Sequence, residues 1–258
     1  MNPRIHPTAI VEEGAILASD VEIGAYAYVG KMARIGQGTI VQHHATVDGN
    51  TEMGRDNNVY PYTFVGAKTQ DLKYKGGEPG LRIGDRNTFR EFCSVHSATD
   101  VGNFTVIGND NHFLAYTHIA HDCVIGNGIV TSNYCGIAGH VAIGDHVVMG
   151  GFAGVHQFCR VGDYVMIGAM SKVVQDVAPY VIVEGNPAET RTLNKVGLER
   201  NGFVPDAVAE IRLAYKILFK SELTREQAIE KLREIASPQK PHIEKMLRFV
   251  EASQRGVC

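Results

Sequence analysis

The chain lacks the features that mark two common functional classes. It has no large charge excess, since 25 Lys and Arg stand against 28 Asp and Glu, and this argues against a nucleic-acid partner. It also has no apolar run long enough to span a membrane. Its first residues, MNPRIHPTAIVEEG, carry charges where a signal peptide needs an apolar core. We therefore expect neither a nucleic-acid complex nor an integral membrane segment.

Cysteines spaced like a zinc motif are also missing. The chain has five cysteines, an odd number that does not make a full set of disulfide pairs. Free thiols are typical of a reducing compartment. We expect a cytoplasmic protein with no bound metal. The cysteines are Cys93, Cys123, Cys135, Cys159 and Cys258.

What the chain does contain is an apolar residue at every sixth position. Eleven successive positions from Ile5 are apolar, and sixteen more follow from Ile83, among them Val101, with only Thr131 polar. A six-residue period fits neither an amphipathic helix nor a hairpin meander, but it fits short strands joined by tight turns. Three such strands make one coil of about 18 residues. The pattern predicts a mainly-β protein, a parallel β-helix in which residues 18 apart stack.

The repeat is interrupted once and then ends. Residues 66–82 leave the six-residue phase and are expected to form a projecting loop. Of 28 glycines, 25 lie in residues 1–186, whereas 13 of 25 Lys and Arg lie in residues 187–258. This change predicts a β-helix over residues 1–186 and a C-terminal α-helical domain over residues 187–258, where apolar residues take helical spacing.

A histidine-rich segment, HIAHDC at residues 118–123, is the strongest candidate for a site. Stacking at 18 residues would place Gly139 beside His121 and His140 beside Asp122. Such a group could hold zinc, or one imidazole could act as a general base with a carboxylate fixing its tautomer. The adjacency of His121 and Asp122 favours the base, and the Gly139 N–H could bind a developing oxyanion.

Several motifs together resemble one enzyme family. The segments QDLKYKGGEP (70–79), HIAHDC (118–123), AGH (138–140) and GVHQF (154–158) are similar to those of the UDP-N-acetylglucosamine acyltransferases, and the likeness runs the full length. It implies a left-handed β-helix, a homotrimer with sites at subunit interfaces, and transfer of an (R)-3-hydroxyacyl chain from acyl carrier protein to the glucosamine 3-position of UDP-N-acetylglucosamine. This reaction begins lipid A synthesis. The phosphopantetheine thioester is a co-substrate, and no cofactor is implied.

The resemblance also assigns roles to residues. It implies His121 as general base, Asp122 as its orienting partner and Gly139 as oxyanion donor. Further positions match family contacts with substrate: Asp71, Lys73, His118 and His140 for the sugar and diphosphate, His96 nearby, His156 and Gln157 for the acyl or pantetheine arm, and Asn194 and Arg200 for the nucleotide. Ala169 stands where long-chain members have Gly, which suggests a somewhat shorter acyl chain.

Departures from the family pattern leave the acceptor open. Ser97-Ala98-Thr99 replaces Arg-Gly-Thr, and the loss of a cation near the sugar favours an acceptor that can itself be positively charged. The alternative is therefore N-acylation of a UDP-2-acetamido-3-amino sugar. Val196 and Asn201 replace a Glu and an Arg of the nucleotide-binding stretch, so those contacts are also expected to differ. A more distant alternative is a β-helix metalloenzyme similar to the γ-class carbonic anhydrases.

Overall fold

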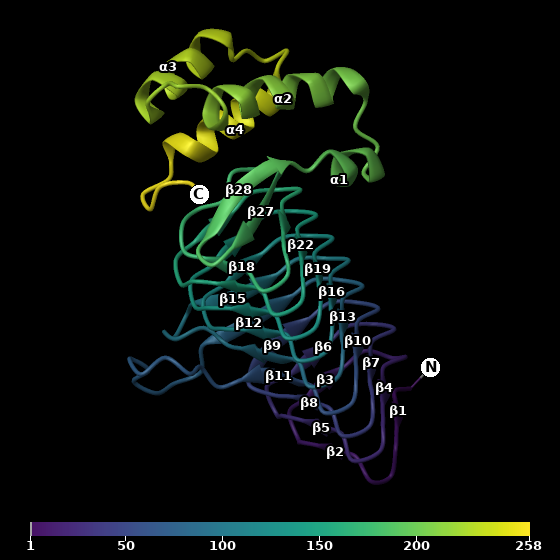
Figure 1. Ribbon diagram of the computed structural model, residues 1–258. Helices are drawn as coiled ribbons and strands as arrows, with labels where there is room; N and C mark the ends of the chain where they lie inside the picture. The colour runs from purple at the N-terminus through teal and green to yellow at the C-terminus, as the bar shows by residue number, and fades with distance from the viewer. Residues whose placement is uncertain (1) are drawn as a thin grey trace.

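The computed structural model describes residues 2–258 as a tapering stack of coils with helices at its C-terminal end (Figure 1). Its strands form three faces of 11, 9 and 8 strands, which are parallel except for one antiparallel strand at the C-terminal end. The first face contains β1 (Arg4–Ile5), β4 (Glu22–Ile23), β7 (Ile40–Val41), β10 (Asn58–Val59), β13 (Thr88–Phe89), β16 (His112–Phe113), β19 (Val130–Thr131), β22 (Val148–Met149), β25 (Met166–Ile167), β27 (Val181–Gly185) and β28 (Ala188–Leu193).

The other two faces complete each coil. The second contains β2 (Ile10–Val11), β5 (Tyr28–Val29), β8 (Thr46–Val47), β11 (Phe64–Ala67), β14 (Ser94–His96), β17 (His118–Ile119), β20 (Gly136–Ile137), β23 (Gly154–Val155) and β26 (Lys172–Val173). The third contains β3 (Ile16–Leu17), β6 (Arg34–Ile35), β9 (Asn50–Met53), β12 (Gly80–Ile83), β15 (Phe104–Ile107), β18 (Val124–Ile125), β21 (Ala142–Ile143) and β24 (Arg160–Val161).

One residue of each short strand points into the stack. Ile119, Ile137, Val155 and Val173 follow one another on the second face, and all are at most 2% exposed. Thr131, the polar member of the repeat, is also fully buried, and its hydroxyl lies 2.8 Å from that of Thr117. The predicted parallel β-helix with stacked six-residue positions is therefore confirmed.

The stack is interrupted in two places, not one. The projecting loop runs between β11 and β12 and separates Val65 from its partner Val95. A second insertion follows β14, because Ser94 pairs with His118, 24 residues later. The prediction that Val101 points inward is wrong: it is 67% exposed and lies against Gly77 of the loop. Val101 matches the six-residue phase by coincidence, because it contacts the projecting loop and not the interior of the coil.

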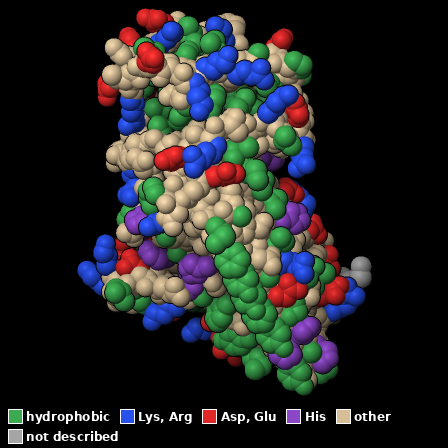
Figure 2. Space-filling model, viewed as in Figure 1, with side chains coloured by type: hydrophobic (Ala, Val, Ile, Leu, Met, Phe, Trp, Pro, Cys, Tyr) green, Lys and Arg blue, Asp and Glu red, His purple; other side chains and the backbone are tan. Residues whose placement is uncertain are grey.

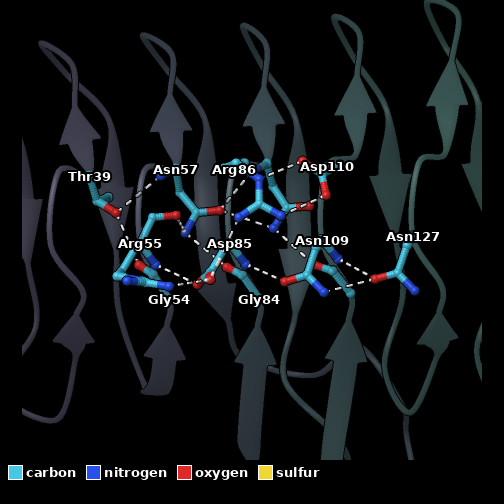
Figure 3. A network of polar contacts seen from close by, with 12 residues as sticks. Thr39, Gly54, Arg55, Asn57, Gly84, Asp85, Arg86, Asn109, Asp110 and Asn127 are labelled. Carbon is cyan, nitrogen blue, oxygen red and sulfur yellow. Dashed lines mark hydrogen bonds and ion pairs between the residues drawn. The ribbon is translucent and has the colours of Figure 1, made fainter.

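Asparagine side chains tie the coils together in two rows along one corner (Figure 3). The buried Asn87 donates its backbone and side-chain N–H groups to the Asn57 side-chain oxygen, and Asn111 repeats both bonds to Asn87. Asn109 and Asn127 form an equivalent pair in the second row of the same corner. These bonds satisfy backbone N–H groups that face a neighbouring turn, where burial without a partner would be costly.

The C-terminal region begins with a hairpin and continues as helices. β27 and β28 pair antiparallel around the cis Asn186–Pro187 bond, so the predicted boundary at 186/187 falls inside a sheet. Helices begin only at Lys195: α1 (Lys195–Arg200), α2 (Pro205–Phe219), α3 (Arg225–Ile235) and α4 (Pro241–Glu251). Within residues 2–258, no helix is long and apolar enough to cross a membrane.

Candidate active site

A groove of about 440 Å³ lies on the outer side of the second face. Its floor follows the stacking register, since His118, Gly136, Gly154 and Lys172 are successive partners in β17, β20, β23 and β26. A Cβ at Gly136 or Gly154 would meet no atom within 4 Å, so these glycines leave an open channel along the helix axis. Gln70 reaches the groove from the projecting loop.

His121 and Asp122 lie at the edge of this groove. The His121 Nδ1 is 2.8 Å from the Asp122 carboxylate, and both side chains are largely buried. Asp122 has a φ of 59°, the left-handed conformation of a coil corner, and its N–H donates to the Thr105 hydroxyl at 2.8 Å. Because an ionised carboxylate only accepts hydrogen bonds, Nδ1 carries the proton. The lone pair of Nε2 is then available as a base.

Gly139 lies directly against the His121 ring. A Cβ at this position would be 2.6 Å from Nε2 and 2.5 Å from Cε1, closer than any real contact. Among the residues that the structure describes, the Gly139 N–H donates no hydrogen bond. The predicted stacking of Gly139 on His121 is confirmed, and it leaves one free backbone donor beside the base.

Two further histidines lie nearby: His118 precedes His121 in the same coil, and His96 lies one coil earlier. The His96 Nδ1 is 2.7 Å from the Lys68 carbonyl, and the His118 Nδ1 is 2.8 Å from the Ser94 hydroxyl. Burial lowers the pKa of both imidazoles, and the neighbouring imidazoles lower the pKa of His118 further. Both rings are therefore neutral near neutral pH and suited to hydrogen bonding with an uncharged ligand.

The first residues of the projecting loop also lie near His121. The Lys73 backbone N–H donates to Asp71 at 2.9 Å and is the main reason that the pKa of this carboxyl lies below its usual value. The other Asp71 oxygen is 3.4 Å from the hydroxyl of Thr99. Lys73 itself is exposed on the loop. Asp71 is thus an ionised carboxylate close to His121.

Asp71, His121 and His140 also form a possible metal-binding group. One ligand atom from each lies within 4.8 Å of the others, and two imidazoles with one carboxylate suit a divalent transition-metal ion. The His140 Nε2 lies 3.8 Å from Asp122, so the predicted pairing of these two residues is confirmed. The expectation of no metal stays a prediction.

The remaining predicted site residues are more scattered. His156 lines the groove, and Gln157 is exposed next to it. Ala169 is exposed and does not line the groove within one chain. Asn194 caps α1, accepting from the Gly197 N–H at 3.1 Å and donating to the Tyr164 carbonyl, while Arg200 is exposed at the last turn of that helix. The roles of these residues in binding stay predictions.

Ser97, which motivated the 3-amino alternative, does not face His121. Its backbone N–H donates to the Ala67 carbonyl at 2.9 Å. The residue lines a separate cavity of about 360 Å³ that also contains Lys31, Lys68 and Glu78. The replaced position therefore borders a different space from the groove of the candidate base.

Sequence reasoning did not identify three residues of the site: Gln70, Thr99 and Lys172. Lys172 had a signal, because it follows His118, Gly136 and Gly154 at 18-residue steps. Thr99 had no signal from the repeat, since it lies in the second insertion, where the register is lost. Its one signal was that it matches the threonine of the family's Arg-Gly-Thr segment.

A parallel β-helix with a histidine–carboxylate pair beside an apolar groove defines this chain as an acyltransferase of the hexapeptide-repeat class. Two curated relatives are named acyl-[acyl-carrier-protein]–UDP-N-acetylglucosamine O-acyltransferase. The one from Akkermansia muciniphila is 51% identical over 99% of both chains, and the one from Thermodesulfovibrio yellowstonii is 43% identical over 98% of both. The family model for domain 2 of UDP-N-acetylglucosamine O-acyltransferase matches residues 176–258.

Solved structures agree with these relatives. The UDP-N-acetylglucosamine O-acyltransferase of Moraxella catarrhalis superposes with a TM-score of 0.93 at 42% identity, and that of Acinetobacter baumannii with 0.94 at 43%, each over 98% of both chains. The chain belongs to the UDP-N-acetylglucosamine O-acyltransferase family. The predicted left-handed β-helix is thereby confirmed.

Proposed function

We propose that this chain transfers an (R)-3-hydroxyacyl group from acyl carrier protein to the 3-hydroxyl of UDP-N-acetylglucosamine, the first step of lipid A synthesis, with His121 as general base. The observation that carries this proposal is the His121–Asp122 pair beside the groove, in a chain whose relatives are named for that reaction.

The chemistry needs one base that later acts as an acid. His121 Nε2 takes the proton of the sugar hydroxyl as its oxygen attacks the thioester carbonyl carbon. Asp122 stabilises the imidazolium that forms. The carbonyl oxygen becomes an oxyanion, and the free Gly139 N–H is available to bind it. When the C–S bond breaks, the phosphopantetheine sulfur leaves and takes the proton back from His121, which regenerates the enzyme.

The groove supports an acyl chain as its occupant. Its glycine floor at Gly136 and Gly154 is apolar and open, and Ile137, Ala138 and Val155 also border it. An extended hydrocarbon could lie along the coils with its thioester beside His121. We expect Ala169, Gln157 and His156 to influence this chain or the pantetheine arm, as the family resemblance implies.

A basic groove supports acyl carrier protein as the donor. It has a volume of about 420 Å³, lies between β28 and α2, and is lined by Lys195, Arg212, Lys216 and Lys220 with no carboxylate. Acyl carrier protein is acidic, so complementary charge would favour docking there. The four buried cysteines are free thiols, which is in keeping with the cytoplasm as the place of action.

A homotrimer is supported by an exposed aromatic ladder. Its ring centres lie 4.6–5.3 Å apart along one corner, yet its tyrosine and phenylalanine residues remain 43–63% exposed in the single chain. Figure 2 shows a continuous hydrophobic band along the β-helix, and surfaces of this kind usually bury against another protein. We infer burial against copies of this chain. The ladder consists of Tyr26, His44, Tyr62, Phe92, Tyr116, Tyr134 and Phe152.

The hydroxyl acceptor is favoured over the 3-amino sugar. The curated relatives are named O-acyltransferases, and Ser97 lies away from the groove. Mass spectrometry of the product can test this choice, with UDP-N-acetylglucosamine and its 3-amino analogue each offered with a series of acyl carrier protein thioesters. We expect an ester and a preference for the 3-hydroxyl. A clear preference for the amine would replace this proposal with N-acylation.

The mechanism is tested by His121→Ala. We expect activity to fall by at least the roughly 10²–10⁴-fold that a general base contributes, with the thermal unfolding temperature and oligomeric state unchanged. Activity within about tenfold of the unaltered enzyme would mean that His121 is not the base.

A further inference from the structure

Thr99 connects the projecting loop to the candidate catalytic pair. It is buried, with only 6% of its surface exposed, in the second insertion of the β-helix. Its backbone N–H donates to both carboxylate oxygens of Asp122, at 3.2 and 3.3 Å. Its hydroxyl is 3.1 Å from the His121 Nδ1 and 3.4 Å from an Asp71 oxygen. One residue therefore touches both members of the pair and the loop.

The donors and acceptors around Thr99 fit one consistent set of hydrogen-bond directions. The Asp122 carboxylate requires a proton on Nδ1 of His121, so the Thr99 oxygen must accept from that ring. The Thr99 hydroxyl proton is then free to donate to the ionised Asp71. Thr69, 3.1 Å away, accepts the Asp71 N–H and can donate its own proton to Thr99. Every donor and acceptor in the chain of bonds is satisfied.

This arrangement has a consequence for catalysis. The ring of His121 is held by two acceptors on its Nδ1 side, Asp122 and Thr99, which fixes its rotation as well as its tautomer. The opposite nitrogen, Nε2, lies beside Gly139, and both residues border the groove. The Thr99 hydroxyl also links Asp71, on the projecting loop, to His121.

We propose that Thr99 is a positioning residue for acyl transfer: its hydroxyl and N–H hold His121 and Asp122 in the basic Nε2 orientation and join them to the acceptor-binding loop through Asp71. This inference rests on the proposed general-base role of His121. It adds no chemical step, because the Thr99 proton stays on its oxygen. The proton that moves is that of the sugar hydroxyl, which His121 Nε2 takes and then gives to the leaving sulfur.

A buried threonine can also serve packing alone. Thr63 is such a residue: it is 1% exposed, and its hydroxyl donates to the Arg90 carbonyl at 2.6 Å, without contact to His121 or Asp122. A structural role predicts that loss of either hydroxyl reduces stability and nothing else. A positioning role predicts that only loss of the Thr99 hydroxyl changes the His121 ring and the turnover rate.

The test compares Thr99→Val, which removes the hydroxyl, with Thr99→Ser, which keeps it, in the full-length protein. We expect Thr99→Val to lower kcat by about 10–100-fold, since small misplacement of a reacting group has effects of this size, with the KM for the acyl donor unchanged. Thr99→Ser should recover kcat to within about threefold. Thr63→Val should leave kcat unchanged while lowering the unfolding temperature.

A second measurement does not depend on turnover. In histidine-labelled protein, the Nδ1 proton of His121 should give a downfield NMR signal, assigned by its loss in His121→Ala. We expect this signal in the unaltered protein and in Thr99→Ser. In Thr99→Val it should move upfield or exchange with water. Thr69→Val, which removes only the outer link of the bond chain, should keep the signal and raise the KM for the sugar nucleotide.

The results separate this inference from the proposed function. If Thr99→Val keeps kcat within twofold, or if its NMR signal is unchanged and Thr99→Ser fails to restore activity, Thr99 is not a positioning residue. If the unaltered protein does not acylate UDP-N-acetylglucosamine, the proposed function fails instead, while the NMR comparison still reports whether Thr99 orders the His121 ring.

Discussion

The coils from Phe104 to Val173 repeat regularly, whereas those between Phe64 and Asn103 do not. In the regular coils, strand partners such as His118 and Gly136 are 18 residues apart in sequence and adjacent on the same face. In the interrupted coils, the chain leaves the stack twice, at the projecting loop and after β14. Yet the interruptions carry Asp71 and Thr99 to His121, which is itself on a regular coil. The regular coils hold His121 in place, and the two insertions bring Asp71 and Thr99 to it.

The largest expected effect tests how closely the regular coils fit around the base. Gly139→Ala places a methyl group 2.6 Å from the His121 Nε2, so either the ring or the coil must move. We expect kcat to fall by about 100-fold or more, because the displaced base loses its alignment. Steady-state kinetics of the folded protein would measure the change.

Gly136→Ala is the matched control on the same face. Its Cβ would meet nothing within 4 Å, so only the open groove changes. We expect near-normal kcat with short acyl chains and weaker use of the longest ones, since the methyl narrows the channel. Equal losses in the two variants would show that the close contact at Gly139 has no special importance.

The second expected effect compares two hydrophobic residues of the same six-residue phase. Phe113, in a regular coil, is fully buried and stacks on Phe89 at 5.3 Å between ring centres, whereas Val101, at the interruption, is 67% exposed. Phe113→Ala should reduce the free energy of unfolding by about 3–5 kcal/mol because it opens a cavity. Val101→Ala should change it by less than about 0.5 kcal/mol. Denaturant unfolding at one protein concentration measures both, and a similar loss in each would contradict the comparison.

The regular coils, and the contacts between residues stacked in them, could be predicted from the sequence. An inward apolar residue every six positions predicted the coils, and the 18-residue step correctly predicted Gly139 against His121 and His140 near Asp122. These predictions succeeded because a regular repeat turns sequence separation directly into distance.

The same reasoning fails where the repeat fails. The contacts of Thr99 cross both insertions, so no fixed step predicts them. Val101 matched the six-residue phase by coincidence, and the hairpin of β27 and β28 extends the sheet beyond the point where the composition changes. Apolar periodicity identifies the interior of a coil, but it does not distinguish a residue that packs against a loop.

The smallest expected effect asks whether the interrupted coils are as tightly packed as the regular ones. Cys93 lies among the interrupted coils and Cys123 among the regular ones, and burial raises the pKa of each thiol to about 12. At pH 8, thiolate is therefore scarce at both sites, and iodoacetamide should alkylate both slowly in the folded protein. Faster reaction at Cys93, measured by mass spectrometry, would mean that the interrupted coils open more often.

The same thiols give a pH dependence of defined sign. An unfolded cysteine titrates near its ordinary pKa of about 8.5. Between that pH and about 12, the folded chain therefore keeps protons that the unfolded chain has lost. Stability is thus fully present below the ordinary pKa and decreases as the pH rises above it. Cys93→Ala and Cys123→Ala should each flatten the decline in unfolding temperature above pH 9 by a similar amount. If only Cys123→Ala does so, the interrupted coils hold their interior less tightly than the regular coils.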